Sequence, residues 1–121
     1  QAAEFLEQAG ILLIKDFGLD EAANYPNLIT LGGILVNNYE AYDRAERLYR
    51  LLIDEVPERW DAYYELAATL QAKDDIPAAL ELLHQYKARY GEESRLLEAE
   101  QILHNALQYR QVAPESSAAQ P

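Results

Sequence analysis

Residues 60–93 read WDAYYELAATLQAKDDIPAALELLHQYKARYGEE, and the segment before them, residues 26–59, reads PNLITLGGILVNNYEAYDRAERLYRLLIDEVPER. Aligned without gaps, the two segments share three identical pairs: Ala45 with Ala79, Leu48 with Leu82, and Glu58 with Glu92. Other aligned pairs keep their apolar character, among them Val36 with Leu70 and Tyr49 with Leu83. A repeat with a period of 34 residues indicates supersecondary units that stack against one another.

Both segments, and the chain around them, have the apolar spacing of amphipathic helices. Apolar residues recur three and four positions apart, and Gly, Pro and Asp mark the breaks between the runs. Asp75 followed by Pro77 is a typical helix start, and Gly91 is a typical helix end. We predict six helices, over residues 2–17, 26–38, 39–56, 60–72, 77–90 and 94–110.

The first and last of these helices have their own signals. The first carries its apolar residues at Phe5, Leu6, Ala9, Leu12, Leu13 and Phe17. Gly18 is its predicted stop, and residues 20–23 are predicted to form one more turn that Asp20 caps. Ser94 is the predicted cap of the last helix.

Residues 26–38 can be interpreted in two ways. Ile29, Ile34 and Val36 have β-branched side chains, and two adjacent glycines cost a helix roughly 2 kcal/mol relative to alanine. Propensity alone therefore favours a strand and a bend. The alignment with residues 60–72, whose composition is helical, favours a helix, and a helix is our prediction.

The second segment resembles the tetratricopeptide repeat (TPR), a helical hairpin of the same length. Eight apolar positions around a helix break at residues 73–75 carry the resemblance: Trp60, Tyr63, Leu66, Ala67, Leu70, Ile76, Ala79 and Leu83. The resemblance implies an all-α fold, a right-handed α-α superhelix of two TPR-like helical hairpins flanked by N- and C-terminal capping helices. It places a repeat domain at residues 1–112 and a linker-like or disordered tail at 113–121.

The first segment departs from the family pattern at its glycines. Gly32 stands where the family prefers Leu. We expect Gly33 and Ala45 to take the places of Ala67 and Ala79, the small residues that let the two helices of a hairpin approach closely.

Composition restricts the function further. With a net charge of −11, the chain lacks the clustered Lys and Arg that neutralise phosphates, so no nucleic acid and no anionic membrane surface is an expected partner. No apolar run is long enough for membrane insertion. The absence of Cys excludes disulfides and leaves both a cytoplasmic and a periplasmic location open. Abundant Ala and an excess of Arg over Lys favour a bacterial source, and the absence of Met favours a processed chain or an excised domain.

No residue pattern indicates catalysis. His84 and His104 each lie in a predicted helix without a second His one turn away, and a metal site needs three or four converging ligands. We interpret both as exposed or interhelical polar residues. The Gly32–Gly33 pair lacks the Lys-Ser/Thr of a phosphate-binding loop. We therefore predict no enzyme, no cofactor and no metal ion.

The TPR resemblance implies a binding function. In that family the first helix of each hairpin lines a concave groove that holds an extended peptide or a partner helix. The corresponding partner-binding residues here are Asn27, Thr30, Ile34, Asn37, Asn38, Asp61, Tyr64, Ala68, Gln71, Arg95, Glu98, Ile102 and Asn105. Their amides suit a peptide backbone, and Tyr64 suits an apolar anchor. The predicted function is a protein–protein interaction module.

One ligand of the family is not expected. Domains that hold the acidic C-termini of heat-shock chaperones use a clamp of basic and Asn side chains, and here those positions are Thr30, Ile34, Glu65, Arg95 and Ala99. An alternative function remains, a structural segment of a longer repeat scaffold or a small assembly or secretion chaperone. Such a chain could form a homo-oligomer through its terminal helices.

Overall fold

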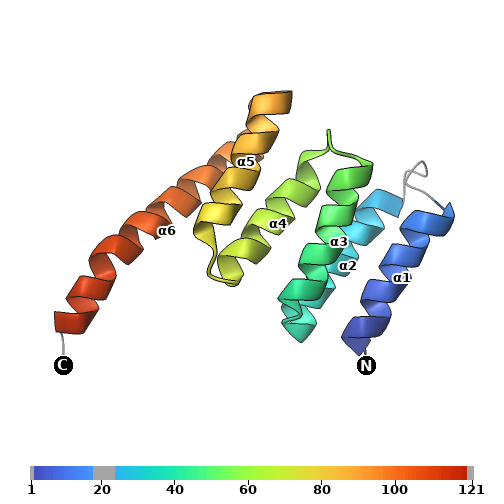
Figure 1. Ribbon diagram of the computed structural model, residues 1–121, viewed down its shortest axis with the longest axis horizontal. Helices are drawn as coiled ribbons and strands as arrows, with labels where there is room; N and C mark the ends of the chain where they lie inside the picture. Colours follow the sequence, from blue (N-terminus) through green and yellow to red (C-terminus); the bar gives the residue numbers. More distant parts are fainter. Residues whose placement is uncertain (1, 18–23, 120–121) are drawn as a thin grey trace.

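The computed structural model describes residues 2–17 and 24–119, with the side chains of residues 2–15 and 24–110. These residues form six α-helices and no strand (Figure 1). The helices are α1 (Ala2–Phe17), α2 (Asn24–Tyr39), α3 (Tyr42–Glu55), α4 (Trp60–Ala72), α5 (Ile76–Tyr90) and α6 (Ser94–Ala119). The prediction of an all-α chain is confirmed.

The helices form an extended array in which α1 and α6 occupy opposite ends (Figure 1). Each helix packs against the next one in the chain. Contacts between helices two apart join α2 to α4 and α4 to α6 on one side of the array, and α1 to α3 on the other. The even-numbered helices thus form one continuous layer, with α4 at its centre.

The core between these helices is apolar and continuous from α1 to α6. Leu28, Leu48, Leu66 and Ala79 come from four different helices and are fully buried. Tyr49, Tyr63 and Tyr86 are also buried. The apolar faces of α3, α4 and α5 therefore lie where their periodicity predicts, whereas α2 buries Leu28, Gly32 and Leu35, one residue away from the positions that the alignment predicts.

In the first hairpin, the glycine at the close contact between α2 and α3 is Gly32 and not Gly33. A Cβ atom on Gly32 would lie 2.4 Å from the ring of Tyr49, whereas a Cβ on Gly33 would meet no atom within 4 Å. The prediction for Gly33 is wrong. Gly32 aligns with Leu66 and Tyr49 with Leu83, so a small-and-large pair in the first hairpin replaces two leucines in the second. The ring of Tyr49 takes the space beside the helix that a side chain at position 32 would occupy.

Residues 26–38 are helical, as the alignment predicts, and α2 starts earlier, at Asn24. The early start places Tyr25 inside the helix, where its side chain is buried and its hydroxyl oxygen accepts a hydrogen bond of 3.1 Å from the Ala62 N–H. Arg59 lies over the Tyr25 ring, 4.1 Å from its centre. Burial raises the pKa of Tyr25 to about 12. Tyr25 therefore provides a hydrogen-bond partner for a backbone N–H in the first turn of α4. The N-cap residue of α4, Arg59, makes no such bond with its side chain.

The buried face of α1 differs from the prediction. Ala3, Glu7, Gly10 and Ile14 face the neighbouring helices. In contrast, the side chains of the predicted apolar residues Phe5 and Leu12 are 72% and 54% exposed. The reason is that Glu7 is held by two arginines of α3, and Gly10 permits close contact with Leu31 and Leu48.

Several helix ends differ from the predicted ones. Residues 40 and 41 are outside any helix, and Glu40 has a left-handed φ of 50°, so α3 begins at Tyr42 instead of residue 39. Asp75 caps α5 as predicted, because its carboxylate accepts a hydrogen bond from the Ala78 N–H. At α6 the cap is Glu93 and not Ser94, since the Glu93 carboxylate accepts from the Arg95 N–H.

The last helix is longer than predicted. It continues past Arg110 to Ala119, and the additional segment, residues 111–119, contains three alanines but also Pro114. That residues 113–121 serve as a linker stays a prediction. The predictions for Gly18 and for residues 20–23 lie outside the described residues. Among the residues that the structure does describe, no helix has both the length and the apolar character required to cross a bilayer.

Candidate functional site

The layer of α2, α4 and α6 carries two hollows, one on each side of α4. The hollow between α2 and α4 has a volume of about 340 Å³ and is lined by Ile29, Thr30, Gly33, Ile34, Asn37, Asn38 and Glu65. The hollow between α4 and α6 is smaller, about 70 Å³, and is lined by Tyr64, Ala67, Ala68, Gln71, Ala99, Ile102 and Leu103. Residues of α4 contribute to both hollows, and we call the two hollows together the even-helix groove.

Most of the residues predicted to bind a partner line this groove. Those that do so are Thr30, Ile34, Asn37, Asn38, Tyr64, Ala68, Gln71 and Ile102. Those that line neither hollow are Asn27, Asp61, Arg95, Glu98 and Asn105. Of the first set, Asn37, Asn38 and Gln71 lie in the last turns of α2 and α4. Of the second set, Asn27, Asp61 and Arg95 lie near the starts of their helices. Eight of the thirteen predicted positions therefore line the even-helix groove.

The two hollows differ in chemistry. The hollow beside α2 combines three uncharged polar side chains, Thr30, Asn37 and Asn38, with the carboxylate of Glu65. Burial raises the pKa of Glu65, and the nearby Asp61 carboxylate adds to the effect. A half-buried carboxylate with a raised pKa is a favourable place for a positively charged group of a ligand, which would restore the lost solvation.

The hollow beside α6 is apolar and has an aromatic edge. Tyr64 is 37% exposed and meets Trp60 edge-to-face, with the ring centres 6.1 Å apart. The Arg95 guanidinium lies over the other ring of this pair, 5.4 Å from the centre of Trp60. Ile102, which is 57% exposed, closes the opposite side of the hollow. Such a pocket with one exposed aromatic ring suits an apolar side chain.

Sequence reasoning missed several residues of the groove. Ala67, Ala99 and Leu103 line the apolar hollow, and Ile29 and Gly33 line the polar one. Glu65 was considered only as a position of the absent chaperone clamp. The signal that would have found these residues is their position one turn, or one residue, from predicted groove residues on the same helix.

A further hollow, of about 380 Å³, lies beside the start of α3 and is lined partly by Arg44, Arg47 and Lys73. Its bases have carboxylate partners. Arg44 and Arg47 both bind Glu7, and Lys73 lies 2.7 Å from a carboxylate oxygen of Glu46. The positive charge is therefore largely neutralised by the protein itself, and this hollow is a poor site for an anion.

On the α5–α6 surface, three potential metal ligands lie close together. His84 comes from α5, and Glu100 and His104 come from α6. The hydrogen bond with His84 is the main reason why the pKa of Glu100 is lowered. The sequence places Glu100 one turn before His104 on the same helix, but it does not indicate that His84 lies beside them, because His84 is on another helix.

Comparison of the chain with models of known protein families, with curated proteins and with solved structures found no match.

Proposed function

We propose that this chain is a protein–protein interaction module that binds a peptide segment or a helix of a partner protein in the even-helix groove. In this proposal α2–α3 and α4–α5 are two TPR-like hairpins of a right-handed superhelix, and α1 and α6 cap its ends. The chain acts by binding and not by catalysis. The observation that carries the proposal is that residues chosen from a repeat pattern line two adjoining hollows on one layer of helices.

The chemistry of the groove specifies a ligand with two features. An apolar side chain would enter the hollow between α4 and α6 and contact Tyr64 and Ile102. A Lys or Arg would pair with Glu65 in the neighbouring hollow, where Asn37 and Asn38 can exchange hydrogen bonds with the peptide backbone. The net charge of −11 would further attract a basic ligand.

A peptide-display library screened against the immobilised protein would provide a ligand for the test. Calorimetry should then show that Tyr64→Ala weakens binding of the selected peptide at least about tenfold, or about 1.4 kcal/mol. Asn37→Ala should have a smaller effect. Glu65→Gln should weaken binding of peptides with Lys or Arg, mostly at low salt, because salt screens charge pairs at the surface.

The matched control is Glu81→Ala, a change at an exposed residue of α5, outside the groove. Its affinity for the selected peptide should equal that of the unchanged protein. Circular dichroism should show that all variants keep their helical content. A larger loss of affinity for Glu81→Ala than for Tyr64→Ala would place the ligand on the odd-numbered helices and refute the proposal.

A second candidate function, association through a terminal helix, is favoured by α1. Phe5 and Leu12 are seven residues apart, so they share one face of the helix, and both are largely exposed. Such a face suits either a further repeat or a second copy of the chain. Light scattering, described in the Discussion, distinguishes a self-associating chain from a monomeric module.

A further inference from the structure

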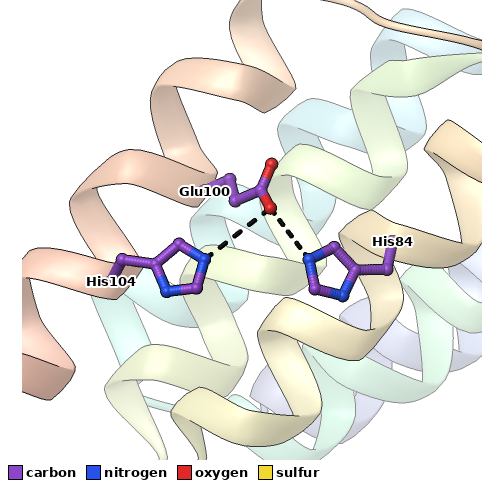
Figure 2. Close-up of side chains that lie close together, drawn as sticks. All are labelled: His84, Glu100 and His104. Atoms are coloured by element: carbon purple, nitrogen blue, oxygen red, sulfur yellow. Dashed lines mark hydrogen bonds and ion pairs between the residues drawn. The ribbon is translucent and has the colours of Figure 1, made fainter.

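His84, Glu100 and His104 direct their side chains to a common point between α5 and α6 (Figure 2). The Nε2 atom of His84 lies 2.8 Å from Oε2 of Glu100, and the Nε2 atom of His104 lies 3.7 Å from the same oxygen. All three ligand atoms lie within 4.8 Å of one another. In the close-up, the two imidazole rings approach the carboxylate from opposite sides.

The local structure explains this convergence. Glu100 and His104 are four residues apart on α6, so their side chains lie on the same face of the helix. His84 is contributed by α5, which packs against α6 along this face. The side chains of both histidines are about half exposed, at 50% and 46%, and that of Glu100 is 19% exposed. An ion from solution can reach the cluster, and the histidine rings have room to adjust.

The distances are close to those that a bound ion requires. Two ligands each about 2.1 Å from a tetrahedral ion are separated by about 3.4 Å. The two His–Glu distances of 2.8 and 3.7 Å lie on either side of this value, and no two of the three ligand atoms are more than 4.8 Å apart, so rotation of the exposed rings can bring all three to one ion. Two imidazoles and one carboxylate form a donor set that zinc and similar ions favour, with water in the remaining position.

We propose that His84, Glu100 and His104 bind one divalent transition-metal ion, such as Zn²⁺, which links α5 to α6. This inference does not depend on the proposed peptide groove, because none of the three residues lines it. The ion would fix α6 in place against the second hairpin. Since α6 also supplies Ile102 and Leu103 to the apolar hollow, the ion would hold one wall of that hollow.

One neighbouring charge opposes the ion. The Lys87 ammonium is near enough to help lower the pKa of Glu100. The ammonium also lies 3.8 Å from a carboxylate oxygen of Glu92, so it has a second anionic partner besides Glu100. Binding of a cation would therefore move the ammonium towards Glu92. Lys87→Gln removes the repulsion and should tighten binding of the ion.

The test uses the full chain, freed of any histidine tag and of metal. Calorimetric titration with Zn²⁺ should give one ion per chain, and Zn²⁺ should raise the melting temperature, because a ligand that binds only the folded state stabilises it. His84→Gln and His104→Gln should each weaken Zn²⁺ binding by at least tenfold and abolish the rise in melting temperature. Titration with Co²⁺ should change its visible spectrum in the unchanged protein and not in these variants.

The matched control is Glu98→Gln, which removes a carboxylate from the same helix but outside the cluster. It should bind Zn²⁺ as tightly as the unchanged protein. Melting of the metal-free variants should match that of the metal-free unchanged protein within a few degrees, which separates a loss of ligand from a loss of folding. Zn²⁺ affinity that survives in either histidine variant, or one ion shared by two chains, would overturn the proposal. Weaker binding of Zn²⁺ by the Lys87→Gln variant would also overturn the proposal.

Discussion

Glu7 is a buried acid on a helix whose other buried residues are small or apolar. Its side chain is only 3% exposed, and its two oxygens accept hydrogen bonds from Arg44 at 2.8 Å and from Arg47 at 2.5 Å. These bonds connect α1 to α3 directly. A charged hydrogen-bonded pair of this kind explains why Glu7 turns inward while Phe5, two residues earlier, remains at the surface.

Glu7→Gln should therefore destabilise the protein, by about 1–3 kcal/mol, because it removes charge-assisted hydrogen bonds and leaves buried polar groups less well paired. Denaturation in urea at pH 7 would measure the difference. Glu4→Gln is the control, since Glu4 is exposed and lies 3.8 Å from Arg44. It should change the unfolding free energy little. Equal stability of Glu7→Gln and the unchanged protein would mean that the pairs with α3 contribute nothing.

The same residue predicts how stability changes with pH. The hydrogen bond from Arg47 is the main reason why the pKa of Glu7 lies below its ordinary value of 4.5. A carboxyl group with a lower pKa in the folded state stabilises that state above its unfolded pKa, and the contribution disappears as the pH falls through the folded pKa. The stability difference between the unchanged protein and Glu7→Gln should thus be constant near neutral pH and shrink below about pH 4.5.

Single side chains were only partly predictable. Tyr63, an apolar position of the repeat resemblance, is buried, and Tyr64, a predicted binding residue, is 37% exposed and lines a hollow. The face of α1 was not predictable in the same way. Its apolar residues surround most of the helix, and the face that is buried depends on Glu7, whose arginine partners are far away in the sequence.

Packing between helix elements gives a direct comparison of two adjacent glycines. In α2, a methyl group on Gly32 would collide with the Tyr49 ring of α3, whereas one on Gly33 would point into open space. Gly32→Ala should lower the unfolding free energy by about 1–3 kcal/mol through overpacking. Gly33→Ala should raise it by up to about 1 kcal/mol, because alanine favours a helix more than glycine does. Urea denaturation of the two variants would measure both effects.

A double mutant identifies the cause. Tyr49→Leu introduces the residue that the second hairpin has at this position, and it removes the ring that the new methyl group would meet. The two changes together should cost less than the sum of the single changes, by at least about 0.5 kcal/mol. Strict additivity would show that Gly32 and Tyr49 are not coupled.

The second hairpin offers a parallel test on α5. Ala79 is fully buried against its neighbours, while Ala88 on the same helix is exposed. Ala79→Leu should cost roughly 1–3 kcal/mol, because a larger side chain must force α4 and α5 apart. Ala88→Leu makes the same chemical change at the surface and should leave the melting temperature nearly unchanged. Equal melting temperatures for the two variants would mean that the packing of α4 against α5 does not require a small residue at position 79.

The elements themselves were largely predictable, because the repeat supplied information that propensity lacked. The helix predicted over residues 60–72 has the same bounds as α4, and the alignment with it correctly identified α2 as helical in spite of its glycines. The ends were less predictable where they depend on distant partners. The start of α2 places Tyr25 against α4, and no local pattern around Tyr25 reveals this contact.

At the scale of the whole molecule, the sequence predicts which residues share a helix face but not which faces meet. That the even-helix groove binds a partner stays a prediction, but eight of the residues that line it were predictable from the repeat resemblance. The cluster of His84, Glu100 and His104 was not, because its members come from two helices that meet only after the hairpins stack. Apolar residues left at the ends of the stack are likewise visible only in the assembled array.

Those end residues lead to a prediction about association. Phe5 and Leu12 on α1 are exposed, and so is Ile102 on α6. The net charge of −11 makes two chains repel each other. Salt screens this repulsion, and at 0.1 M the screening length is about 10 Å. We expect the average mass measured by light scattering to rise above that of a monomer as salt and protein concentration increase. Leu12→Ser should suppress the rise if α1 forms the contact, whereas Ile102→Ser should suppress it if α6 does. A monomer under all conditions would eliminate self-association and leave a monomeric binding module.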